Sequence, residues 1–216
     1  MLLDGQLLAH PFFSPAADRN KEVILLELQR LLPAHGVALE IASGTGRHIA
    51  WFAKAFPGWL WTPSDMHACE FATIVAHTTA AGLCNVRVPH VLDVLSHSWQ
   101  ESPLTDLEDA RFDVIYCANM LHIAPLAACA ALMQGAAKRL TPKGQLVLYG
   151  PYLEEDGAAS KGNVAFDASL RSSNPDWGLR RREEVELAAR QAGLWLQKQV
   201  NMPSNNLLLV FGPAPA

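Results

Sequence analysis

The most informative stretch of the sequence is a glycine-rich turn, Leu39-Glu-Ile-Ala-Ser-Gly-Thr-Gly46, which directly follows a run typical of a buried strand. Glycines at the carboxyl end of a strand let the backbone approach a ligand closely, and open α/β sheets bind ligands at this edge. The dinucleotide fingerprint G-x-G-x-x-G is not met, because Ile49 and Ala42 stand where glycines would complete it. A phosphate-binding P-loop is not met either, since no Gly-Lys-Ser/Thr follows. The turn predicts a ligand without a pyrophosphate, with Glu40 placed to hold a cation or an amine; a tight turn without any ligand is the alternative.

Carboxylates follow the next two expected strands. Asp65 ends the second strand, where an acidic side chain can accept hydrogen bonds from both hydroxyls of a ribose. Its alternative role is to cap the following helix. Asp93 follows the third strand and could accept from an adenine amino group while Val94 packs on the ring. A solvated loop aspartate is the alternative there.

A third group of polar residues follows the fourth and fifth strands. The segment Cys117-Ala-Asn-Met-Leu-His122 ends the fourth strand beside the first, so Asn119 and His122 could face the reacting end of the ligand. A structural role is the alternative for a lone histidine. His122 and Tyr152 are the candidate catalytic groups. The candidate substrate-binding groups are Tyr149, Asn163, Asp167 and Arg171. Aromatic packing is the alternative for both tyrosines, and a helical i,i+4 ion pair for Asp167 and Arg171.

The order of elements predicts how these residues are positioned. Short β-rich runs alternate with segments of helical period, which is typical of βαβ units and a parallel sheet. Only five residues separate the last two strands, too few for a crossover helix, so they should pair antiparallel. We expect an α/β, Rossmann-like, seven-stranded, mostly parallel sheet with one reversed strand and helices on both faces. Residues 151–176 break the rhythm and are expected to form a long loop on the substrate side. The strands are expected at 37–41, 59–62, 85–91, 112–118, 145–149, 194–200 and 206–211, the helices at 17–32, 46–55, 66–81, 126–140 and 181–192, and a turn at 141–144.

Length and composition restrict the class of protein. The 216 residues suggest one domain, 1–216, in which 1–36 form an N-terminal cap segment and helix. A net charge of −4 argues against a general nucleic-acid binder, and no apolar run is long enough to span a bilayer. Asp4 and the absence of a basic residue before the first apolar stretch argue against an export signal. The 4 cysteines show neither a C-x-x-C pair nor zinc spacing, so we expect reduced thiols, no metal and a cytoplasmic protein.

Together these residues resemble the class I S-adenosylmethionine (SAM)-dependent methyltransferases over about residues 37–212. The turn is similar to their E-x-G-x-G-x-G motif, with Ala42 in place of the first glycine. A narrower resemblance, to the methyltransferase-like protein 26 family, covers nearly the whole chain. It is carried by Phe13-Ser-Pro-Ala-Ala-Asp-Arg-Asn-Lys21, Cys117-Ala-Asn-Met-Leu-His122, Leu148-Tyr-Gly-Pro-Tyr152, Asn163-Val-Ala-Phe-Asp-Ala-Ser-Leu-Arg171 and Pro203-Ser-Asn-Asn206.

The resemblance implies a cofactor site. Asp65 would bind the ribose hydroxyls, and Asn119 would lie near the sulfonium. Arg19, Asn20 and Lys21 lie before the first core helix, where a basic residue would meet the cofactor carboxylate or form a surface ion pair. The methionine moiety and ribose would contact Glu40, Ser43, Gly44 and Gly46, and the adenine would contact Asp93 and Val94.

The expected function is transfer of a methyl group from SAM to a small-molecule acceptor, leaving S-adenosylhomocysteine. A SAM-binding sensor or partner subunit without turnover is the alternative from another class. An NAD(P)-dependent or nucleotide-sugar oxidoreductase is disfavoured by the missing third glycine and the final hairpin. An RNA or protein acceptor stays open, although the acidic pI counts against RNA. The oligomeric state is not predicted.

Overall fold

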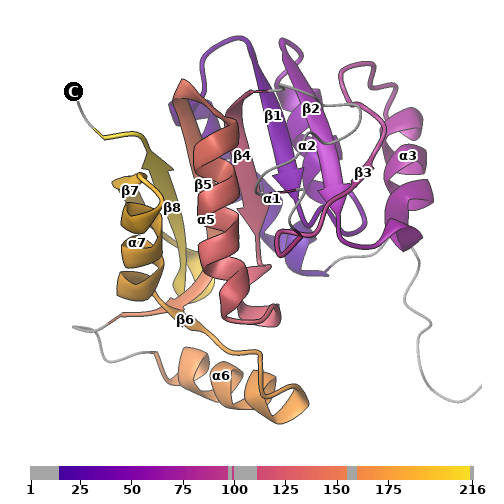
Figure 1. Ribbon diagram of the computed structural model, residues 1–216. Coiled ribbons are helices and arrows are strands. Elements are labelled where there is room, and N and C mark those ends of the chain that lie inside the picture. The colour runs from indigo at the N-terminus through magenta and orange to yellow at the C-terminus, as the bar shows by residue number, and fades with distance from the viewer. Residues whose placement is uncertain (1–14, 97–98, 100–110, 155–159, 215–216) are drawn as a thin grey trace, which may run out of the picture.

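The structure is a computed structural model that describes residues 15–96, 99, 111–154 and 160–214. Its sheet has 8 strands in the order β3-β2-β1-β4-β5-β8-β7, with the short β6 paired to β5 off this path (Figure 1). The neighbouring strands β3, β2, β1, β4 and β5 run parallel to one another, whereas β8 is antiparallel to β5 and β7. The predicted Rossmann-like sheet with one reversed strand is confirmed, and β6 is an addition to the predicted strands. The strands are β1 Gly36–Ile41, β2 Trp59–Asp65, β3 His90–Val91, β4 Phe112–Ala118, β5 Leu140–Leu153, β6 Arg180–Arg181, β7 Trp195–Met202 and β8 Asn206–Gly212.

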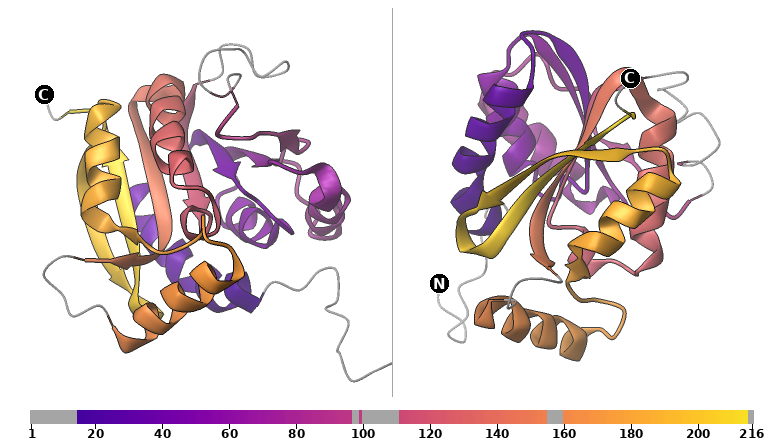
Figure 2. Two further views of the ribbon diagram at one scale, coloured as in Figure 1. Left: turned by 60° about the horizontal axis from the view of Figure 1, so that its bottom comes forward. Right: turned by 90° about the vertical axis from the view of Figure 1, so that its left-hand side faces the viewer.

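Helices cover both faces of the sheet (Figure 2). One face packs against α1, α2 and α3 in a core that holds Ile24, Phe52 and Trp61. The other packs against α5 and α7 around Trp99 and Leu132. The helices are α1 Pro15–Leu31, α2 Arg47–Ala55, α3 Phe71–Ala80, α5 Ala127–Arg139, α6 Lys161–Ser173 and α7 Arg182–Gln191, with 3-10 turns at Ala68–Glu70, Leu121–Ile123 and Pro203–Asn205.

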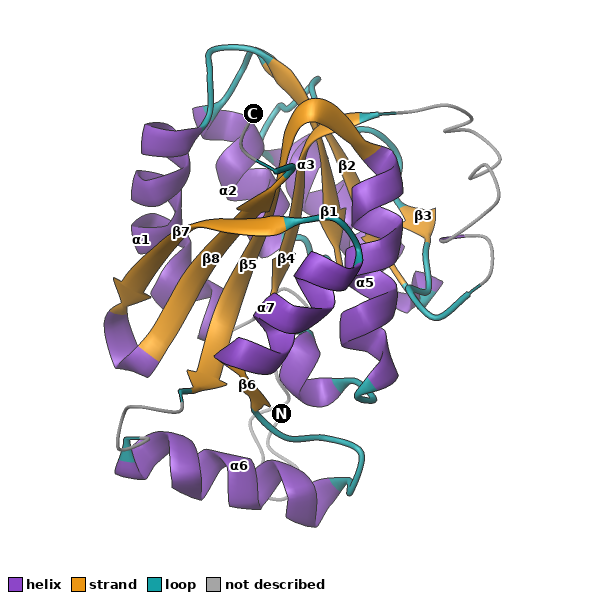
Figure 3. Ribbon diagram, turned by 60° about the vertical axis from the view of Figure 1, so that its left-hand side comes forward, coloured by secondary structure: helices purple, strands orange, loops and turns teal. Residues whose placement is uncertain are grey.

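The expected loop at 151–176 is wrong over most of its length. Strand β5 continues to Leu153, and α6 occupies Lys161–Ser173, below the tip of β5 in Figure 3. Ser160 caps this helix, because its hydroxyl accepts the N–H of Asn163 at 3.1 Å. The helix buries only Asn163 and Leu170, so its sequence lacks the apolar stripe that marks a core-facing helix. Residues 155–159 of the expected loop lie outside the described part of the chain.

Two other elements differ from expectation. The third strand was expected over 85–91, but only His90–Val91 pair as β3, with an isolated bridge between Val86 and Trp61. The expected turn at 141–144 lies inside β5, where the register with β4 shifts between Phe112 and Val114. The N-terminal residues used in the argument on export lie outside the described part of the chain. Among the described residues, no helix is long and apolar enough to cross a membrane.

Candidate functional site

The glycine-rich turn joins β1 to α2 with an unusual backbone. Ala42, Gly44 and Gly46 all adopt left-handed conformations, with φ of 56°, 51° and 75°. At Gly46 a Cβ atom would lie 3.1 Å from the Cα of Ile74, so only glycine fits against α3. At Gly44 a Cβ would meet no atom within 4 Å, which means that this part of the turn borders open space. The turn therefore exposes backbone at the carboxyl end of β1, as the sequence predicted.

Asp65 ties the end of β2 to this turn. Its Oδ2 accepts the N–H of Gly44 at 3.0 Å, and its Oδ1 accepts the N–H of His67 at 3.2 Å. Ser43 and Ser64 make a second link, since Ser43 N donates to Ser64 O at 2.8 Å and Ser64 N to Ser43 Oγ at 3.1 Å. The ends of β1 and β2 are thus held as one rigid ledge, with a carboxylate beside the turn.

Glu40 is buried directly behind the ledge. It is 2% exposed, and its Oε2 has no hydrogen-bond partner. Burial raises the pKa of this carboxyl to about 8, and the nearby charge of Asp65 raises it further while Ser43 opposes the shift. At neutral pH the group mostly keeps its proton, because the hydrogen bond from Ser43 does not offset the cost of burying the charge.

Asp93 and Val94 follow β3 as expected. The Oδ1 of Asp93 accepts the N–H of Leu95 at 2.8 Å, so the carboxylate closes a turn on its own backbone. Val94 is 6% exposed and belongs to the core on the α5 side of the sheet. Because β3 pairs with β2, both residues lie on the same edge of the sheet as Asp65.

A cavity of about 580 Å³ lies across the carboxyl ends of β4 and β5. The structure brings six of the predicted site residues to its wall, drawn from segments far apart in the sequence. These are Arg19, Asn20, Asn119, His122, Tyr149 and Asn163. The remaining wall is formed by Val23, Ile123, Pro151, Gly162, Phe166, Pro203, Ser204, Asn205 and Asn206.

Helix α1 contributes to this cavity because an ion pair between Asp18 and Arg47 holds it against α2. Within α1, Asp18 also pairs with Lys21 at 2.6 Å. His48 of α2 lies 2.7 Å from the amide oxygen of the adjacent Asn20 and fixes that side chain. The sequence analysis assigned no role to His48, because its partner lies on another helix.

Two titratable groups of the cavity wall, His122 and Tyr149, are neutral near pH 7. Burial lowers the pKa of His122 to about 4, and the nearby charge of Arg180 lowers it further. The ring contacts Phe166 edge-on, with 5.6 Å between centroids. Burial raises the pKa of Tyr149, although a hydrogen bond with Asn20 and the charge of Arg19 oppose the shift.

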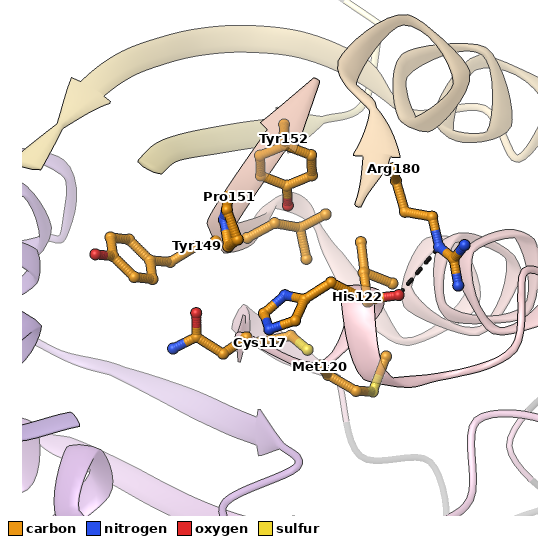
Figure 4. Close-up of a pocket in the computed structure, with 11 residues that line it drawn as sticks. Cys117, Met120, His122, Tyr149, Pro151, Tyr152 and Arg180 are labelled. Carbon is orange, nitrogen blue, oxygen red and sulfur yellow. Dashed lines mark hydrogen bonds between the residues drawn. The ribbon is translucent and has the colours of Figure 1, made fainter. Parts of the chain in front are cut away.

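Three of the predicted catalytic and substrate-binding residues do not line this cavity. Tyr152 projects from β5 in a different direction from Tyr149 and packs in the core on the α5 side. It lines a separate small pocket beside Cys117 and Arg180, which Figure 4 shows. Asp167 and Arg171 pair with each other at 2.9 Å, and Asp167 also accepts the N–H of Leu179 at 2.7 Å. The i,i+4 pair is therefore present, and it fixes α6 to the segment before β6.

The cavity wall also contains strained backbone that the sequence did not reveal. Asn119, Ser204 and Asn205 have φ of 58°, 60° and 57°, values that non-glycine residues rarely adopt. Such conformations concentrate at functional sites. No group of three or more potential metal ligands is gathered among the described residues.

Comparison with known proteins identifies a family and a fold. A family model described as "Protein of unknown function (DUF938)" matches residues 11–212. Among solved structures, an O-methyltransferase family protein from Burkholderia thailandensis is similar, with a TM-score of 0.71 and 16% identity over 93% of this chain and 60% of that chain. The mitomycin 7-O-methyltransferase superposes with a TM-score of 0.70 and 18% identity over 89% of this chain and 54% of that one.

Human N-acetylserotonin methyltransferase, solved in complex with SAM, gives a TM-score of 0.69 and 13% identity over 93% of this chain and 53% of that one. At these identities the likeness shows the fold, which is that of class I SAM-dependent methyltransferases. The chain spans 60% or less of the length of each of these three proteins.

Proposed function

The chain belongs to the DUF938 family of proteins of unknown function, and on that premise we propose that it is a SAM-dependent methyltransferase acting on a small molecule. The observation that carries the proposal is the ledge at the ends of β1 and β2, where Gly44 borders open space and Asp65 holds its N–H. The fold shared with SAM-dependent methyltransferases supports this choice of ligand. The narrower relation to the methyltransferase-like protein 26 family, the single domain and the cytoplasmic location stay predictions.

The residues of the ledge fit SAM chemically. Glu40 presents a buried carboxyl oxygen without a partner, and a cationic ligand group nearby would favour the ionised form of this carboxyl. Asp65 keeps acceptor capacity for ribose hydroxyls, because each of its oxygens accepts a single backbone N–H among the described residues. Asp93 and Val94 lie on the neighbouring strand end for the adenine. Asn20, in the cavity wall, would meet the cofactor carboxylate, and Arg19 beside it is left for the acceptor rather than for the cofactor.

When bound, SAM supplies a methyl group on a positively charged sulfur. The chain's own task is then to bind the acceptor at the cavity wall, to align it and to exclude water. Asn119 and His122 follow β4, which pairs with β1 in the sheet, and both residues line the cavity. We assign them to the reacting end of the cofactor. Neutral His122 can accept a hydrogen bond there. Tyr149 and Asn163 would contact the acceptor.

Isothermal titration calorimetry with SAM, S-adenosylhomocysteine and NADH tests the cofactor. We expect binding of the first two ligands and none of NADH. Gly44→Ala should weaken SAM binding by about tenfold or more, since a methyl group would enter the open side of the turn. Gly82→Ala is the matched control, because Gly82 is also left-handed and also borders open space, but lies at the end of α3.

Three outcomes would contradict the proposal: no binding of SAM, binding of NADH, or equal effects of the two glycine substitutions on affinity. A separate incubation with methyl-labelled SAM and a metabolite extract tests turnover. Binding without transfer of label would favour a SAM-binding sensor or partner subunit.

A further inference from the structure

The wall of the large cavity is electrically one-sided. Among the described residues that line it, Arg19 is the one with an ionised side chain at neutral pH, and no aspartate or glutamate is present. His122 adds no charge, since burial holds its pKa at about 4. A cationic acceptor would meet an uncompensated positive charge there, whereas an anion would find a counter-ion.

Unused hydrogen-bonding groups gather at the same wall. The side chains of Asn119, Ser204 and Asn205 line the cavity, and within the described part of the chain none of the three side chains makes a hydrogen bond. All three residues hold positive φ, so strained backbone presents them there. Asn163 supports this arrangement, because its amide donates to Asn205 O at 3.2 Å and to Tyr152 O at 3.1 Å. The amides and the hydroxyl can donate to the oxygens of an anion.

Among the described residues of the cavity wall, no side chain is suited to removing a proton near pH 7. A general base works best when its pKa is near the operating pH. His122 is too weak a base, with a pKa of about 4, and burial raises the pKa of Tyr149 above its ordinary value. A hydroxyl or an ammonium acceptor would need such a base, but a carboxylate is already an anionic nucleophile.

Resting on the proposed function, we propose that the acceptor is a small carboxylic acid, bound and methylated as its carboxylate anion. A carboxylate oxygen forms the new C–O bond to the methyl carbon while the S–CH3 bond breaks and its electron pair stays on sulfur. The sulfonium cation and the carboxylate anion become two uncharged groups, a thioether and a methyl ester. No proton is released, so the step needs no base.

The cavity also limits the body of this acid. Its volume of about 580 Å³ lies within the range of sites for small molecules. Val23, Ile123 and Phe166 supply apolar contacts beside the polar wall. An acid with an apolar or aromatic body therefore fits better than a polyanion.

The chemistry of the labelled product tests this proposal without knowledge of the acceptor. The full chain is incubated with methyl-labelled SAM and a low-molecular-weight metabolite extract, and the product is treated with mild alkali. A methyl ester releases the label as volatile methanol, whereas methyl ethers and methylamines retain it. We expect alkali-labile label, and we expect prior amidation of the extract's carboxylic acids to abolish the transfer. Alkali-stable label, or transfer that survives amidation, would overturn the carboxylate assignment and leave the methyltransferase intact.

Two further measurements separate the possible failures. Calorimetry reports SAM binding independently of methyl transfer. Absence of SAM binding refutes the proposed function itself. Binding of SAM without any transfer of label refutes both the methyl transfer and the carboxylic acid as its acceptor. With the acid purified from the active fraction, Arg19→Gln should raise the acceptor KM by about tenfold or more. Arg190→Gln, on the exposed face of α7, is the matched control. An unchanged acceptor KM in Arg19→Gln would contradict the charge argument.

Discussion

The two halves of the candidate site are built in different ways. The ledge at the ends of β1 and β2 consists of one short turn, the aspartate that holds it and a buried carboxyl, Glu40. The cavity beyond β4 and β5 is assembled from α1, α6, two strand ends and the turn at Pro203–Asn205. The ledge keeps an uncompensated acid, whereas the cavity keeps a neutral histidine and a cation. The difference indicates two ligands of different charge, a cation beside the ledge and an anion in the cavity.

The largest effect should come from Glu40→Gln, which removes the acid of the ledge. Because the folded-state pKa of about 8 lies above the ordinary 4.5, folding favours the protonated form, and Glu40 lowers the stability as pH rises from 4.5 to 8. The free energy of unfolding of the variant should therefore exceed that of the unmodified chain by about 3 kcal/mol near pH 7. It should also lose SAM affinity by roughly 100-fold. Urea unfolding from pH 5 to pH 8 and calorimetry measure the two effects, and a variant that binds SAM normally would contradict the role of the ledge.

In the cavity, His122 should make the stability depend on pH in the opposite direction. The folded-state pKa of His122, about 4, lies below the ordinary 6.5, so stability is lost as pH falls from 6.5 toward 4. His122→Gln should reduce this loss of unfolding free energy at acid pH by about 2 kcal/mol. Thermal unfolding between pH 4 and pH 7 measures it. The activity of the unmodified chain should show no inflection near pH 6.5, and an inflection there that disappears in His122→Gln would contradict a neutral cavity.

A smaller effect separates the two residues that fix α6. Asp167→Ala should cost about 1–2 kcal/mol, because it leaves the N–H of Leu179 without its acceptor. Arg171→Ala should cost less than about 0.5 kcal/mol, since its side chain is 50% exposed. Chemical denaturation of both variants gives the comparison. If Arg171→Ala instead raised the acceptor KM, Arg171 would belong to the substrate site after all.

The smallest effects concern strained backbone in each half. Ala42→Gly and Ser204→Gly should each change stability by no more than about 1 kcal/mol, and in the stabilising direction, because glycine adopts positive φ freely. Ala42→Gly should leave both ligands' affinities unchanged. Ser204→Gly should weaken only the binding of the acceptor, since it removes a hydroxyl from the cavity wall. Equal acceptor affinity in both variants would argue against a role for the turn at Pro203–Asn205.

The ledge was predictable from the sequence, whereas parts of the cavity were not. Gly44, Gly46 and Asp65 were found from the sequence because a βα turn and the end of the next strand are encoded locally. Helix α6 was not found, since it exposes most of its side chains and carries no apolar stripe. His48 was missed because burial between helices, rather than any local pattern, gives it the contact with Asn20.

The sequence by itself determined the order of elements, the reversed strand and the turn at the end of β1. Periodicity, glycines and the length of a connection are properties of neighbouring residues, and they suffice for those features. Only the tertiary structure decided which polar residues share a cavity, which of Tyr149 and Tyr152 reaches it, and what charge the wall carries. Those properties depend on burial and on contacts between distant segments, which shift a pKa or fix an amide in ways that no local pattern records.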